Sequence, residues 1–160
     1  EWSSPGVRVS KTYEGLDLMI QLWTKDKVDF EGKYYQSKGA ILDPKPLQKP
    51  YPKLIFGSQG TRMLKLAGQY GDICFIPPWP GKNPEDMKQI VKESAQLHNR
   101  TNKIAFMAGE MGPSDIGEYL TKVEQAVGDG AGYFLASFQR TTNLTDTIKK
   151  FATEIIPSFR

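Results

Sequence analysis

The chain has 160 residues, of which 39% are apolar and 24% are charged, a composition typical of a soluble globular domain. Its 21 Lys and Arg against 18 Asp and Glu give a formal charge of +3, too small to indicate a nucleic-acid or membrane partner, and no basic stripe is interleaved with aromatic residues. We therefore expect a small-molecule ligand.

The compartment follows from cysteine usage and from missing targeting signals. No apolar stretch approaches the roughly 20 residues of a membrane span, and residues 1–5 do not resemble a signal peptide, which predicts a cytoplasmic protein. The single cysteine, Cys74, lies in an apolar run and is interpreted as a buried strand thiol. The chain begins without methionine, in a segment that reads as a loop, so we interpret it as a fragment.

The first third of the chain predicts one helix and one surface excursion. Leu16, Met19, Ile20 and Trp23 recur at helical spacing, which predicts an amphipathic helix from about Lys11 to Thr24. The segment from 25 to 52 then becomes rich in proline, with Pro44, Pro46, Pro50 and Pro52. Because proline lacks an amide donor and breaks helices, we expect this segment to be extended and on the surface.

From residue 54 onward, four short apolar runs alternate with four helical patterns. The runs are 54–56, 73–76, 104–108 and 133–136. The predicted inward helix faces are Met63, Leu66, Ala67 and Tyr70; Met87, Ile90 and Val91; Ile116, Leu120, Val123 and Val127; and Ile148, Phe151, Ala152 and Ile155. Strands that are apolar without alternation indicate a parallel sheet covered by helices. This pattern fits either an open doubly wound sheet or half of a (β/α)₈ barrel.

In both architectures ligands bind at the C-terminal ends of the strands, where four loops are expected at 57–62, 77–81, 109–113 and 137–142. The first loop comprises Gly57, Ser58, Gln59, Gly60, Thr61 and Arg62. Its two glycines let a ligand approach the backbone, its hydroxyls lie beside a helix start, and Arg62 adds a positive charge, a combination that suits a phosphate. A purely structural turn is the competing interpretation.

Three further residues at these loops are candidates for substrate binding. Trp79 offers an aromatic wall, although a packed loop tryptophan fits equally well. Glu110 offers a carboxylate and Arg140 a cation, each of which competes with a simple solvated surface role. His98 is interpreted as a solvated surface residue and the glycine-rich turn 128–132 as structural, and no metal-binding motif occurs. The catalytic residues are not identified.

Several segments together resemble the luciferase-like monooxygenase family. They are Glu14-Gly15-Leu16 through Leu22-Trp23-Thr24, Val28 to Tyr35, Pro44 to Pro50, Leu54 to Gly57 and Leu66 to Asp72. The likeness is looser from Asp72 onward, although the ending Phe151 to Arg160 again looks like the family's last helix. The resemblance implies the C-terminal half of a TIM (β/α)₈ barrel, strands five to eight. Residues 1–25 then hold the helix after strand four, 26–53 a proline-rich insertion, and 54–160 four βα units.

The same resemblance implies an oxidoreductase that uses reduced coenzyme F420, a deazaflavin, or reduced FMN for hydride transfer or monooxygenation of a small organic substrate. It assigns the cofactor phosphate to the loop from Gly57 to Arg62. Met63-Leu64-Lys65-Leu66-Ala67-Gly68 with Tyr70-Gly71-Asp72 resembles the F420-dependent branch slightly more.

The chain departs from the family by lacking the first four βα units. We therefore expect the missing N-terminal half of the barrel as its partner, a homodimer as in the family, and little activity from the fragment alone. A non-catalytic flavin-binding protein is the alternative function.

Overall fold

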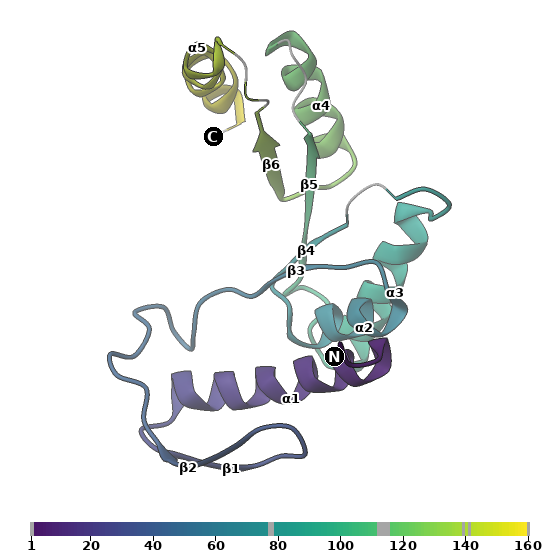
Figure 1. Cartoon of the computed structure of the whole chain (residues 1–160). Helices are drawn as coiled ribbons and strands as arrows, with labels where there is room; N and C mark the ends of the chain where they lie inside the picture. Colours follow the sequence, from purple (N-terminus) through teal and green to yellow (C-terminus); the bar gives the residue numbers. More distant parts are fainter. Residues whose placement is uncertain (1, 77–78, 112–115, 139, 141, 160) are drawn as a thin grey trace. The chain divides into compact units, whose positions relative to one another are not determined.

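The computed structural model describes residues 2–76, 79–111, 116–138, 140 and 142–159. The chain forms two compact units, Glu1–Leu54 and Ile55–Arg160 (Figure 1). None of the helices within the described ranges is long and apolar enough to cross a membrane.

The first unit begins with helix α1, Pro5–Thr24. The Ser4 side chain caps its first turn by accepting a hydrogen bond from the Val7 amide, and Pro5 occupies the position where a missing amide costs nothing. The predicted start at Lys11 was therefore wrong: the cap and proline pair fixes an earlier start than the apolar spacing indicates. Leu16 is the buried residue of this helix.

An antiparallel hairpin follows, formed by β1, Val28–Glu31, and β2, Gln36–Ala40. It was not predicted within the surface excursion. The Glu14 carboxylate of α1 accepts hydrogen bonds from the amides of Lys33, Tyr34 and Tyr35 at 3.0, 2.7 and 2.7 Å, so one side chain satisfies the tip of the hairpin. Residues 41–54 contain neither helix nor strand, as their prolines predict.

The second unit alternates strands with helices. It contains β3, Ile55–Gly57; α2, Thr61–Tyr70; β4, Ile73–Phe75; α3, Pro84–Leu97; β5, Ala105–Met111; α4, Ile116–Gly128; β6, Tyr133–Ser137; and α5, Leu144–Lys150, extended by a π-helical turn Phe151–Ile155 and a 3₁₀ turn Ile156–Phe159. The strands form one parallel sheet in the order β3-β4-β5-β6. The predicted strand and helix alternation and the parallel sheet are thus confirmed.

Strand register places Phe56, Cys74 and Phe106 side by side on one face of this sheet. Phe56 and Cys74 are buried, with Cys74 at 0% exposure, which confirms the buried strand thiol. Burial also raises the pKa of the Cys74 thiol to about 11, because the thiolate would lose its hydration there.

A second part of the core surrounds Tyr119 of α4. It contains the buried residues Tyr119, Val123 and Ile155, against which Phe134, Phe138 and Phe151 pack. The Tyr119 hydroxyl donates to the Ser137 carbonyl at the end of β6. This hydrogen bond and the aromatic contacts of Tyr119 with Phe138 and Phe151 join the last two βα units.

Several details differ from the sequence-based expectations. Strand β5 continues through Gly109, Glu110 and Met111, which were predicted as a loop, because all three pair in register with β6. Two predicted inward residues of the last helix, Ile148 and Ala152, are exposed, and the winding changes from α to π at Phe151, between them. Val127 is also exposed.

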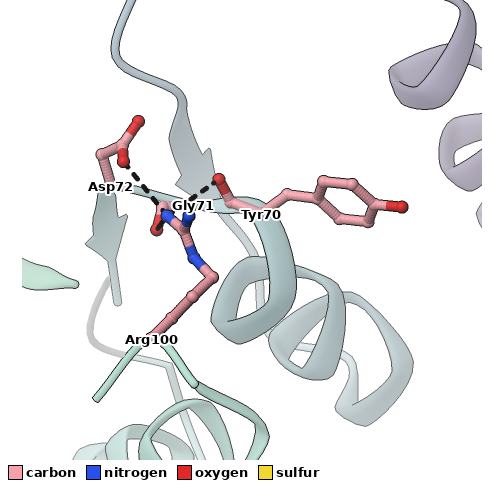
Figure 2. A network of polar contacts seen from close by, with 4 residues as sticks. All are labelled: Tyr70, Gly71, Asp72 and Arg100. Carbon is pink, nitrogen blue, oxygen red and sulfur yellow. Dashed lines mark hydrogen bonds and ion pairs between the residues drawn. The ribbon is translucent and has the colours of Figure 1, made fainter. Parts of the chain in front are cut away.

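A polar network closes the N-terminal end of β4 (Figure 2). The Arg100 guanidinium, which follows α3, donates to the carbonyls of Tyr70 and Gly71 at 3.4 and 2.9 Å and pairs with the Asp72 carboxylate at 3.1 Å. One side chain thereby supplies hydrogen-bond donors to the carbonyl groups at the C-terminal end of α2 and to the carboxylate just before β4. Sequence reasoning did not single out Arg100.

Candidate functional site

The C-terminal ends of the parallel strands bring the predicted site residues to one edge of the sheet. Gly57 is the last residue of β3, and α2 begins at Thr61, so the turn 58–60 carries the chain from strand to helix. The turn from Gly57 to Arg62 therefore occupies the position where barrel and doubly wound folds both bind ligands.

Gly60 is the N-cap of α2 and has φ −86° and ψ 134°. Among the residues that the structure describes, no side chain caps this helix, and its first turn carries no acidic residue. The first amides of a helix have no acceptor within the helix, so they favour an anion. A Cβ built on Gly60 meets no atom of the described residues within 4 Å, so the Cβ position at this end of the helix is open.

Ser58 contributes the most unusual polar atom of the turn. Its Oγ is buried and, among the residues that the structure describes, has no hydrogen-bond partner. A buried hydroxyl without a partner has lost its hydrogen bonds to water and has gained none from the protein. Such atoms often mark a place where a ligand or a bound water supplies the missing hydrogen bond. Thr61 and Arg62 are exposed on the first turn of α2.

Lys82 is a residue of this site that the sequence analysis missed. Its Nζ donates to the Gln59 carbonyl at 2.8 Å and thereby connects the second loop to the first. The Lys82 amide donates to the Trp79 carbonyl at 3.1 Å, and Gly81 adopts φ +75°, so a tight turn presents the lysine. The available signal was a lysine placed directly after a Pro-Gly pair at a strand end.

The three candidate substrate residues lie on separate segments at the same edge. Trp79 follows β4 and is 54% exposed, Arg140 follows β6 and is exposed, and Glu110 pairs in register with Ala136 near the end of β5. Within the described part of the chain, no contact joins the side chains of Trp79 and Arg140. Gln139, also in the fourth loop, lies outside the described residues.

A cavity of about 420 Å³ is found elsewhere in the same unit. It is lined by residues of α3, α4, β5 and β6, including Lys88, Phe106, Lys122 and Phe134, and none of the residues 57–62, Trp79 and Arg140 is among those described as lining it. Phe106 shares the buried face of the sheet with Cys74, so this cavity lies in the helix layer. Within the described ranges, no group of three acidic, His or Cys side chains is arranged to hold a metal ion.

The parallel sheet, its helices and the open turn at a strand end define part of a (β/α)₈ barrel. A solved F420-dependent secondary alcohol dehydrogenase, in complex with an F420-acetone adduct, superposes with a TM-score of 0.78 at 21% identity, covering 100% of this chain and 64% of that one. This similarity confirms the predicted partial barrel.

The family model for luciferase-like monooxygenases matches residues 4–111, and the chain belongs to this family. It is 32% identical over 112 residues to an F420-dependent glucose-6-phosphate dehydrogenase of Mycolicibacterium gilvum, covering 58% of this chain and 33% of that protein. It is 29% identical over 106 residues to a sulfoquinovose monooxygenase of Agrobacterium fabrum, covering 63% and 27%. The matches thus span about a third of these relatives' length.

Proposed function

We propose that this chain supplies the part of a luciferase-like oxidoreductase that binds the phosphate of coenzyme F420 or FMN, at the turn from Gly57 to Arg62. The barrel would be completed by an N-terminal half, which its shorter span relative to its relatives supports. The complete protein would transfer hydride or oxygen to a small organic substrate. We also propose that the complete protein forms a homodimer, as the family resemblance implies.

One observation carries the proposal: the unpartnered Ser58 Oγ lies next to an uncapped helix start with open space at Gly60. These groups fit a phosphate, because they offer a hydroxyl and backbone amides without a competing carboxylate. Lys82 and Arg62 add positive charge to the neighbourhood. Gly57, Ser58, Gln59, Gly60 and Thr61 would hold the phosphate, while Trp79, Glu110 and Arg140 would face the substrate.

Reduced F420 supplies a hydride and reduced FMN activates oxygen, so the redox chemistry resides in the cofactor. The residues of this chain would bind and orient it. The relatives named for F420 and the slight resemblance of residues 63–72 to that branch favour F420 over FMN.

The proposal is tested by Gly60→Val, which places a side chain in the open space beside the α2 amides. The backbone of Gly60 suits any residue, and the new Cβ meets no protein atom, so the fold should persist. We expect F420 and FMN to bind about tenfold more weakly or worse, because a charge-assisted hydrogen bond is lost. Titration followed by cofactor fluorescence measures the two affinities.

The matched control is Gly128→Val, because a Cβ at Gly128 also meets nothing within 4 Å. Gly128 ends α4, which precedes β6, so it lies at the opposite end of the strands from the turn. This variant should bind both cofactors as the parent chain does. Equal affinities for Gly60→Val and the parent would contradict the phosphate site.

A non-catalytic cofactor-binding protein is the alternative, and the sequence resemblance alone supports it. It predicts the same loss of affinity in Gly60→Val. The two functions separate when the chain is joined to an N-terminal half-barrel. Oxidation of reduced F420 by a hydride-accepting substrate, or of reduced FMN by oxygen together with an organic substrate, supports the enzyme, whereas tight binding without turnover supports the alternative.

A further inference from the structure

Two neighbouring loops at the C-terminal edge of the sheet are joined by one hydrogen bond. The Lys82 ammonium, presented by the turn from Trp79 to Lys82, donates to the Gln59 carbonyl at 2.8 Å. Both partners lie in the second unit, and β3 and β4 are paired, so the loops that follow them are adjacent. Lys82 is exposed, and an ammonium has three donor hydrogens, of which this contact uses one.

The accepting carbonyl belongs to the peptide group that also carries the Gly60 amide. The peptide plane is rigid and trans, so the Gln59 C=O and the Gly60 N–H point in opposite directions. Whatever holds the carbonyl toward Lys82 therefore aims the Gly60 amide away from it. Without that hold, this peptide would turn over more easily, because glycine accepts backbone angles of either sign and a Cβ built on Gly60 meets no described atom within 4 Å.

We infer that Lys82 is a positioning residue: by holding the Gln59 carbonyl, it fixes the direction of the Gly60 amide that binds the cofactor phosphate. This inference rests on the proposed function of the turn. It assigns the second loop a role in cofactor binding that is separate from any contact with substrate.

The first test needs no ligand. In Lys82→Met, the Gly60 amide should exchange between two orientations, which shifts and broadens its resonance in ¹⁵N-resolved NMR of the full chain. Lys82→Arg should restore a single sharp resonance, because arginine also donates to a carbonyl. Lys103→Met removes the same charge from an exposed loop before β5 and should leave the Gly60 resonance unchanged. An unaltered Gly60 resonance in Lys82→Met would overturn the inference.

The second test measures affinity for FMN and F420 at low and high salt. Lys82→Met should weaken binding about fivefold to tenfold, the effect of one hydrogen bond, at both salt concentrations. A loss that disappears at high salt would show an effect of charge alone and would contradict positioning. If the parent chain binds neither cofactor, the proposed function fails; if the parent binds and Lys82→Met binds equally well, only the positioning role fails.

Discussion

Glu14 shows how one side chain can organise a segment that lies well beyond it in the chain. Partial burial of its carboxyl acts to raise the pKa, but the amides of Tyr35, Tyr34 and Lys33 and the charge of Lys33 outweigh that effect, so the pKa is lower than its ordinary value. The folded chain thus favours the ionised form, in which both oxygens accept hydrogen bonds.

This arrangement predicts a pH-dependent hairpin tip. Because the pKa is lowered on folding, the stabilisation is complete above the ordinary value of 4.5 and is lost as the pH falls through the lower, folded value. Hydrogen exchange at the amides of Lys33, Tyr34 and Tyr35 should therefore lose protection as the pH falls through the folded-state pKa of Glu14, which lies below 4.5. Glu14→Gln should reduce the protection at neutral pH and remove its pH dependence.

Asp17→Asn is the control for this prediction, since Asp17 is an exposed acid of the same helix without a described contact to the hairpin. It should leave the three amides as protected as in the parent chain. Protection that stays constant to pH 2 in the parent would argue against the role of Glu14.

At the turn from Gly57 to Arg62, the sequence indicates the right residue types, because glycines and hydroxyls at a strand end suit an anion. Two features were beyond its reach. The unpartnered Ser58 Oγ depends on what surrounds the atom, and the Lys82 contact joins two residues that lie 23 positions apart in the sequence. Both are properties of tertiary structure rather than of local pattern.

At the scale of elements, apolar runs predicted the strands well, but not where β5 ends. Gly109 and Glu110 read as loop residues, yet pairing with β6 keeps them extended. The start of α1 and the change of winding at Phe151 were likewise missed, since apolar spacing reports a helix interior better than its ends.

Packing between α2 and α3 supplies a prediction at this scale. A Cβ on Gly68 would approach the Val91 carbonyl oxygen to 2.4 Å and the Ser94 Cβ to 2.6 Å, both on α3. Gly68→Ala should therefore destabilise the fold by about 1–3 kcal/mol through overpacking, although alanine favours a helix. Gly128→Ala meets no such neighbour and should be neutral or slightly stabilising; chemical denaturation measures both. A stabilised Gly68→Ala would show that the helices are not in close contact.

For the molecule as a whole, the order of strands and helices and the family resemblance together predicted a partial barrel. Composition and periodicity alone did not distinguish an open doubly wound sheet from half of a (β/α)₈ barrel, because both architectures are built from the same βα unit. The sequence predicted a proline-rich insertion before residue 54, but not that residues Glu1–Leu54 form a compact unit of their own. The hairpin in that unit was missed because its two strands show no clear apolar alternation.

Cys74 provides a probe of the second unit, because it is the chain's single cysteine and is fully buried. Its pKa of about 11 leaves little thiolate at pH 8. A disulfide reagent should therefore label the folded chain on the order of a hundredfold more slowly than the unfolded chain. Absorbance of the released thiol measures both rates, and comparable rates would show that β4 is not covered.

The Arg100 network has a consequence for how freely neighbouring positions can change. Arg100 reaches Tyr70 and Gly71 through their carbonyl oxygens, which every amino acid possesses, and Figure 2 shows the Tyr70 ring directed away from the guanidinium. These hydrogen bonds therefore depend on the position of the main chain and not on which side chain residue 70 carries. Substituting Tyr70 should leave the hydrogen bonds of Arg100 intact, whereas substituting Arg100 would remove its contacts with Tyr70, Gly71 and Asp72 together.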